Sequence, residues 1–375
     1  MERAAATPRS SQGSLRVRGA VSGYLFKLVR ESLDLTQVQL AERLRIDVTT
    51  VQSWESGRRP LTALRAGDLF KLRMSLVRLG ASPRIFSVLS DAIEADLLIT
   101  DAVAMGAHVV PADQHPLATC VHRRDLTNLI TWPLSGVVPT QLAQIANHQA
   151  PRRGPVADRP ILSIDDRARL FDHLLVTADA HRDDRDVLLR RQAIYLLGFD
   201  TRSTSTEWLA NEQLRAIRHA RMTDHMPSWV AVRSSAIALA RNGNRDPLQV
   251  FVSTALTNDT QDVANLNYWA YWIGEIPDVQ ADDSFMVTMR PDEWAGARLF
   301  NHLVNRLRPG SHHAELNIHT LWTLLAARPA VLTLDANVRA AAKAKIEHTV
   351  EDPSLTAQAR HKLASVAYAI RLAER

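Results

Sequence analysis

Residues 36–60 contain two short amphipathic segments joined by a tight turn, and this pattern constrains the fold more than any other feature of the chain. Apolar residues recur at helical spacing through both segments, which predicts two helices with a common buried side. The residues expected on that side are Val38, Leu40, Ala41, Leu44, Val51 and Trp54. Ile46 falls in the turn between the helices. The pattern therefore predicts a helix-turn-helix corner.

The second helix is expected to run from residue 48 to about residue 55, with Asp47 as its N-cap, while Thr36 caps the first helix. Its outer side carries small, uncharged side chains with hydrogen-bonding groups, where a solvated helix more often carries Glu and Lys. Such a surface fits the major groove of DNA and reads base edges. The residues expected to do so are Val48, Thr49, Thr50, Gln52 and Ser53.

Three arginines flank this corner and are expected to hold phosphates, namely Arg43, Arg58 and Arg59. Residues 1–80 hold 14 Lys and Arg against 7 Asp and Glu, whereas the remainder holds 31 against 33. A basic N-terminal segment joined to a near-neutral body indicates a nucleic-acid module attached to another domain.

The segment resembles the DNA-binding domain of the phage-repressor (Xre-type) helix-turn-helix family over about residues 21–78. The matching motifs are Thr36-Gln37, Leu40-Ala41 and Trp54-Glu55-Ser56-Gly57, followed by Arg58-Arg59-Pro60. The resemblance implies that Gln37 clamps the DNA backbone and that Arg30 and Glu55 form a partly buried ion pair. Arg45 departs from the family, which usually has Gly in this turn, so the turn is expected to be strained.

The rest of the chain is predicted to be helical, which gives an all-α fold. Four parts are expected: a disordered basic tail over 1–20, the helix-turn-helix domain over 21–80, a connecting helix (84–105) with an irregular segment over 81–160, and a large helical domain over 161–375. The connecting helix either dimerises or packs within its own chain. Residues 189–198 resemble 232–241 at an offset of 43 residues. This favours an α-solenoid of HEAT-like helix pairs, with an irregular helical bundle as the alternative.

Residues 265–275 concentrate aromatic side chains beside two asparagines. An aromatic stripe at helical spacing is more often core than ligand cage. If the helical domain senses a small molecule, however, apolar walls with a few polar groups are what a pocket requires. The residues of this candidate pocket are Asn265, Asn267, Tyr268, Tyr271 and Trp272.

No spaced catalytic, phosphate-cradling or zinc motif occurs in the chain, so we expect no enzyme activity, no cofactor and no metal site. Cys120 is the single cysteine, which excludes a disulfide-built fold. No apolar run approaches the length of a membrane span, and the first 20 residues lack a secretory signal, so a cytoplasmic location is expected.

These features together predict a sequence-specific transcriptional regulator that binds double-stranded DNA as a homodimer. In this hypothesis the helical domain supplies dimerisation and senses a small-molecule effector. An alternative makes the helical domain a scaffold controlled by a protein partner. A third hypothesis, an enzyme with a DNA-binding appendage, has no catalytic motif to support it.

Overall fold

The computed structural model describes residues 18–146, 157–220, 226–333 and 336–373, and over these ranges the chain forms helices and turns with no strand. The predicted all-α fold class is thus confirmed. Residues 1–17 of the predicted tail and residues 147–156 of the predicted irregular segment lie outside the described residues. The chain divides into two compact units, one of residues 1–108 and 125–173 and the other of residues 109–124 and 174–375. These limits differ from the predicted boundaries, because residues 84–105 and 125–146 belong to the same unit as the helix-turn-helix.

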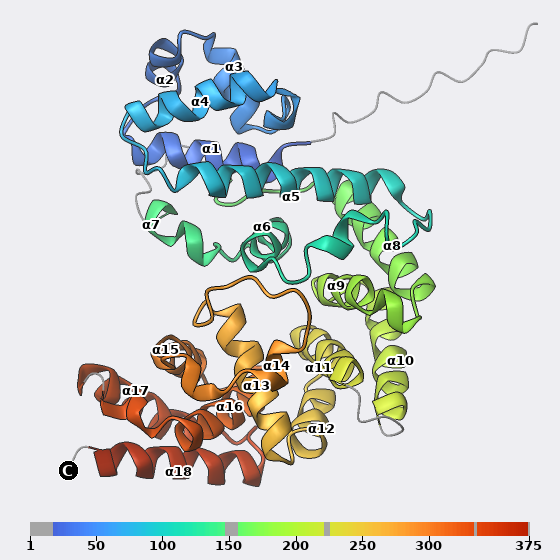
Figure 1. The fold of residues 1–375 in the computed structure, drawn as a ribbon, viewed down its shortest axis with the longest axis vertical. Coiled ribbons are helices and arrows are strands. Elements are labelled where there is room, and N and C mark those ends of the chain that lie inside the picture. Colours follow the sequence, from blue (N-terminus) through green and yellow to red (C-terminus); the bar gives the residue numbers. More distant parts are fainter. Residues whose placement is uncertain (1–17, 147–156, 221–225, 334–335, 374–375) are drawn as a thin grey trace, which may run out of the picture. The chain divides into compact units, whose positions relative to one another are not determined.

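Unit 1 is built around the helix-turn-helix (Figure 1). Its helices are α1 (Ala20–Ser32), α2 (Gln37–Leu44), α3 (Val48–Glu55), α4 (Ala66–Arg78), α5 (Ile85–Met105), α6 (Arg124–Ser135), α7 (Ala143–Ala146) and the first part of α8 (Ile164–Ala180), with short 3-10 helices at Leu61–Ala63 and Thr140–Leu142. Helix α1 packs against both α3 and α5, and α2 packs against α3. Helix α5 therefore packs within its own chain, which was one of the two roles expected for it.

The core of unit 1 contains large apolar side chains that are fully or almost fully buried. Phe26 of α1 meets Trp54 of α3 edge to face, with ring centroids 5.6 Å apart, and Tyr24 meets Trp132 of α6 in the same way at 5.2 Å. Trp54 is 6% exposed, which agrees with its predicted place in the core. Val38 was expected on the buried side but is 54% exposed. The buried residues of α2 are Leu40 and Ala41.

Helix α6 lies in the segment that the sequence predicted to be irregular. Eight of its 12 residues are buried. Pro133 lies in the last turn of the helix, which ends at Ser135. A proline so close to the C-terminal end removes one main-chain hydrogen bond and leaves the preceding turns intact. The number of prolines around it, not the periodicity of the helix itself, led to the wrong expectation.

Unit 2 contains the end of α8 and the helices α9 (Val187–Leu197), α10 (Ser203–Ala220), α11 (Met226–Arg241), α12 (Asp246–Thr254), α13 (Asp259–Trp272), α14 (Phe285–Thr288), α15 (Ala297–Arg306), α16 (Ala314–Ala327), α17 (Ala336–Val350) and α18 (Ala357–Ala373). Short 3-10 helices occupy Pro116–Thr119, Asp184–Asp186, Pro291–Glu293 and Pro329–Thr333.

Helix α16 is at the centre of the unit 2 core, because ten of its 14 residues are buried and it packs against α12, α13, α15 and α18. A helix that is buried on most of its sides is one that other helices surround. The two segments with similar sequences lie in α9 and α11, which pack against each other. A true repeat array stays a prediction.

Candidate nucleic-acid interface

The two helices of the corner begin with capped N-termini, as predicted. The Thr36 hydroxyl accepts a hydrogen bond from the Gln39 main-chain amide at 3.2 Å, and the Gln39 side chain accepts one from the Thr36 amide at 2.8 Å. This reciprocal pair is a capping box. At α3 the Asp47 carboxylate accepts from the Thr49 amide at 2.7 Å and from its hydroxyl at 2.5 Å. The two bonds from Thr49 lower the pKa of the Asp47 carboxyl.

The turn between the helices is left-handed at Arg45, with φ 57° and ψ 46°. The main-chain amide of Ile46 donates to the carbonyl of Ala41 at 3.0 Å, which closes the end of α2. A side chain in this region clashes with its own backbone, so the strain that the sequence predicted at Arg45 is present.

The outer side of α3 carries the residues predicted to read bases. Val51 and Trp54 are buried on the inner side, whereas Thr49 and Gln52 are exposed, and Val48, Thr50 and Ser53 are half-buried. The cap leaves the acceptor lone pairs of the Thr49 hydroxyl unused, since that hydroxyl donates to Asp47. Gln52 makes no side-chain hydrogen bond within the described part of the chain, so its amide is available to an adenine edge.

Gln37 is engaged inside the domain. Its side-chain amide donates to Glu55 Oε2 at 2.7 Å. The same carboxylate accepts from Arg30 through Nε at 2.6 Å and through Nη2 at 3.1 Å, which is the predicted ion pair. Arg30 also donates to the main-chain carbonyl of Leu35 at 2.8 Å. The side chain of Gln37 thus connects α2 to α3. The group of Gln37 best placed for a phosphate is therefore its main-chain amide, in the first turn of α2.

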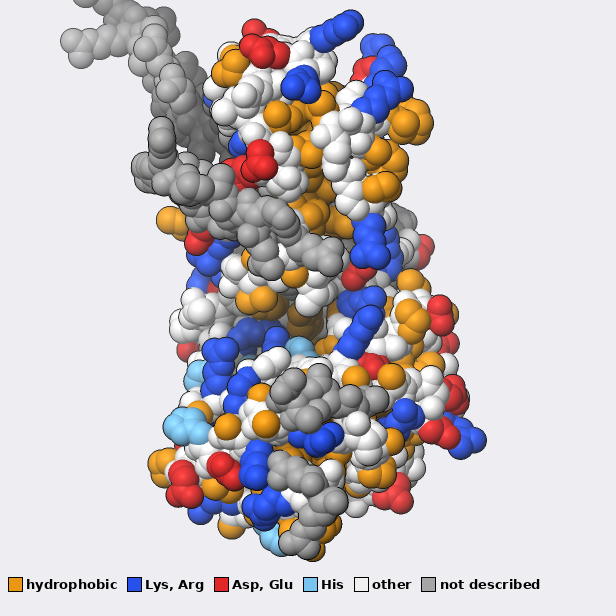
Figure 2. Space-filling model, turned by 90° about the vertical axis from the view of Figure 1, so that its left-hand side faces the viewer, with side chains coloured by type: hydrophobic (Ala, Val, Ile, Leu, Met, Phe, Trp, Pro, Cys, Tyr) orange, Lys and Arg blue, Asp and Glu red, His pale blue; other side chains and the backbone are white. Residues whose placement is uncertain are grey.

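All three arginines predicted to hold phosphates are exposed. Arg58 donates from Nε to the Ser56 hydroxyl at 3.2 Å, and none of the three forms an ion pair with another described residue. Arg45, Arg65 and Lys71 are further exposed cations of unit 1 that the motif did not select. The charge excess of residues 1–80 was the signal that could have found them. Figure 2 shows exposed Lys and Arg beside hydrophobic side chains on the part of the surface formed by this unit.

Helix α3 is held close to α1 by a glycine. A Cβ atom added at Gly23 of α1 would lie 2.3 Å from the main-chain oxygen of Trp54, closer than real side chains approach. At the C-terminal end of α3, Gly57 is buried with φ 70°. That conformation suits glycine and turns the chain away toward Arg58 and Arg59. The recognition surface is therefore rigidly placed by the interior of the domain.

The residues of the candidate ligand pocket lie in the unit 2 core. Asn265 donates to the Thr320 hydroxyl at 2.9 Å, and Asn267 donates to the main-chain carbonyls of Met286 and Met289 at 3.0 and 2.7 Å. The remaining members pack as an aromatic group, Tyr268 and Tyr271 against Trp272. None of these residues lines the cavities found in unit 2. Both amides donate to partners inside the core, and a ligand pocket at this place stays a prediction.

Across the described residues no group of three or more His, Cys, Asp or Glu side chains could hold a metal ion. No helix in the described part of the chain is both long and apolar enough to cross a membrane.

The helix-turn-helix family model matches residues 26–72. This match confirms the resemblance deduced from the motifs and lies within the range of 21–78 given for it. No match was found among curated proteins or among solved structures. The match covers the corner, the capped helices and the buried ion pair, and it does not extend into unit 2.

Proposed function

We propose that this protein is a sequence-specific DNA-binding transcriptional regulator. The observation that supports the proposal best is the outer side of α3. It presents uncharged hydrogen-bonding side chains on a helix that is capped at its start. Exposed arginines that form no ion pair with any described residue flank it. A surface of this kind can donate to and accept from base edges, while the arginines neutralise phosphates.

The proposal includes a homodimer that acts in the cytoplasm on a near-palindromic site. Two copies of α3 would enter successive major grooves, about 34–36 Å apart. A helix-turn-helix domain of this size contacts one half-site, so the second copy supplies the other. The proposal assigns no reaction to unit 2 and gives it a regulatory role, through an effector or a protein partner.

The test is selection of bound genomic fragments by the full-length protein, followed by titration of the selected sequence and a scrambled one at several salt concentrations. Gln52→Ala should weaken binding to the selected sequence by about 1–3 kcal/mol and leave binding to the scrambled sequence unchanged. Arg58→Ala should weaken binding to both sequences. It should also reduce the slope of log affinity against log salt concentration by about one, the value for one released counterion. The matched control is Arg371→Ala, which removes an exposed arginine from α18 and should change neither.

Equal affinity for genomic and scrambled fragments at every salt concentration would rule out sequence-specific regulation. A response of both titrations to Arg58→Ala alone, with Gln52→Ala silent, would reduce the assignment to non-specific DNA binding.

A further inference from the structure

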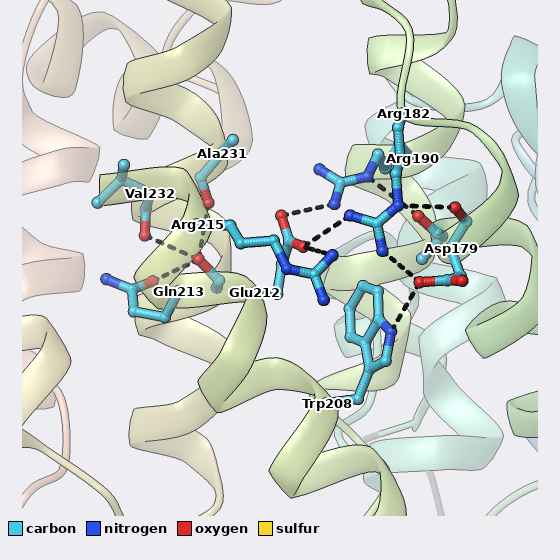
Figure 3. Close-up of polar contacts among 11 residues, drawn as sticks. Asp179, Arg182, Arg190, Trp208, Glu212, Gln213, Arg215, Ala231 and Val232 are labelled. Atoms are coloured by element: carbon cyan, nitrogen blue, oxygen red, sulfur yellow. Dashed lines mark hydrogen bonds and ion pairs between the residues drawn. The ribbon is translucent and has the colours of Figure 1, made fainter. Parts of the chain in front are cut away.

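A cavity of about 190 Å³ opens in unit 2 between the end of α8 and the helices α9, α10 and α11. A single water needs about 10–15 Å³ of such space, so the cavity exceeds that requirement roughly tenfold. Its polar lining includes Arg182 from the segment after α8, Arg190 from α9, and Glu212 and Arg215 from α10 (Figure 3). Space of this size lined by placed charges is what a small polar ligand requires.

Glu212 is the central group of this lining, as Figure 3 shows, and its side chain is only 3% exposed. Oε1 of the carboxylate is paired with Arg190 Nη2 at 2.6 Å. Oε2 is different: it has no hydrogen-bond partner among the described residues, and guanidinium nitrogens of Arg182 and Arg215 lie 3.8 and 3.9 Å away. A buried carboxylate oxygen without a donor is costly, and a donor on a bound molecule would satisfy it.

Arg215 has the complementary need. Its side chain is 45% exposed, and it makes no hydrogen bond to another described residue, so its donors are free for an anionic group at the mouth of the cavity. Arg182 is partly engaged, because it pairs with Asp179, but its Nη1 still faces the same carboxylate oxygen of Glu212. Two guanidinium groups beside one buried acceptor form a site for an oxyanion with a donor next to it.

The walls of the cavity are held by hydrogen bonds that do not use these free groups. Arg190 donates from Nε to the main-chain carbonyl of Ala178, which fixes α9 to the end of α8. On the opposite side Ser235 of α11 donates to the Gln213 side chain of α10 (Figure 3). The cavity is thus built before a ligand arrives, which reduces the entropic cost of binding.

We propose that this cavity binds a small organic oxyanion that carries a hydroxyl or amino donor beside its anionic group. The oxyanion would accept from Arg215 and Arg182, and the donor would bind Glu212 Oε2. Hydroxy acids, amino acids and sugar phosphates share this chemistry. The use of the site as an effector site rests on the proposed function, whereas binding at the site does not.

The test uses full-length protein without DNA. Panels of free α-hydroxy acids, α-amino acids and sugar phosphates are screened by thermal denaturation, with inorganic phosphate as a probe that lacks a neighbouring carbon-borne donor. Compounds that stabilise the protein are then titrated calorimetrically into wild type, Arg215→Met and Glu212→Gln. A panel member should bind more tightly than inorganic phosphate. Its affinity should fall about tenfold or more in Arg215→Met, the loss expected for one charged hydrogen bond.

The matched control is Arg218→Met, which removes an exposed arginine from the same helix outside the cavity and should leave the affinity unchanged. Glu212→Gln keeps an acceptor and adds an amide, so a change in which donor class binds best would locate the ligand at Oε2. The proposal is overturned if no panel member stabilises the wild type, or if Arg215→Met binds it as well as Arg218→Met does. Failure of DNA binding would leave these titrations intact, so the two proposals fail separately.

Discussion

Asp96 caps helix α1 although it lies 74 residues after Ser22, whose main-chain amide donates a hydrogen bond to Asp96 Oδ2 at 2.8 Å. Its Oδ1 accepts from the amide of Val21 at 2.9 Å. Gly19, at the N-cap position of α1, provides no side-chain acceptor. Helix α5 therefore supplies the cap of α1 from its middle, and it ties the helix-turn-helix to the remainder of unit 1.

This carboxyl should make the stability of the protein depend on pH. Asp96 is 3% exposed, and burial raises its pKa from 3.8 to about 6 despite the hydrogen bonds that favour the charged form. Because the folded-state pKa is the higher one, the folded state binds the proton more tightly. The contribution of Asp96 is then fully present below about pH 4 and lost as the pH rises through about 6.

The measurement compares wild type with Asp96→Asn by urea denaturation between pH 4 and pH 8. The stability difference, wild type minus variant, should fall by on the order of 2 kcal/mol from pH 4 to pH 7 and stay level above it. Asparagine does not titrate, so it serves as the reference. A difference that is constant across this range, or one that rises with pH, would show that desolvation does not dominate at Asp96.

Gly23→Ala should separate α1 from α3. The added methyl group would lie 2.3 Å from the Trp54 carbonyl oxygen. That oxygen is a main-chain atom of α3, so it cannot move away without moving the helix. We expect a loss of about 1–3 kcal/mol of stability, as for other overpacked interiors. The matched control is Gly67→Ala in α4, where nothing lies within 4 Å of the new atom. That change should stabilise by up to about 1 kcal/mol, because alanine is the better helix former. Equal effects of the two substitutions would contradict the close packing of α1 on α3.

Arg45→Gly should stabilise the protein. At φ 57° an arginine carries about 1–2 kcal/mol of strain that glycine lacks, while the extra freedom of glycine in the unfolded chain returns part of it. The expected net gain is about 0.5–1 kcal/mol, measured by chemical denaturation. Glu42→Gly, within α2 and three residues earlier, should instead destabilise by about 1 kcal/mol. If both glycines destabilise, the turn is not strained at Arg45.

The helix caps and the turn between α2 and α3 could be predicted from the sequence, because they depend on the local spacing of residues. Thr36 and Asp47 were identified as caps from their position before apolar-periodic runs, and the αL turn at Arg45 followed from a motif position. Long-range relationships had no such signal. Nothing near Ser22 indicates that Asp96 caps it, and Arg182 and Glu212 reach one cavity only after α8 to α10 have packed. The partners of the α13 asparagines had no such signal either, because they lie 19 to 55 residues away.

The ion pair between Arg30 and Glu55 should contribute far more than any surface pair of unit 1. The two side chains are 10% and 5% exposed, and the same carboxylate also accepts from Gln37. Glu55→Gln removes the closer counterion of Arg30 and leaves Glu31, whose Oε1 lies 3.5 Å from Nη2. The loss should be about 3 kcal/mol, at the lower end of the range for a broken buried pair. The control is Asp68→Asn, since the Asp68–Lys71 pair is 55% and 80% exposed and should be worth less than about 1 kcal/mol.

A double-mutant cycle with Arg30→Met completes the test by urea denaturation. The double variant should lose less stability than the two single losses added together, because Arg30→Met removes the charge that Glu55→Gln leaves without its nearest counterion. Additive losses would mean that the two residues stabilise the domain independently, through packing and through the Leu35 carbonyl.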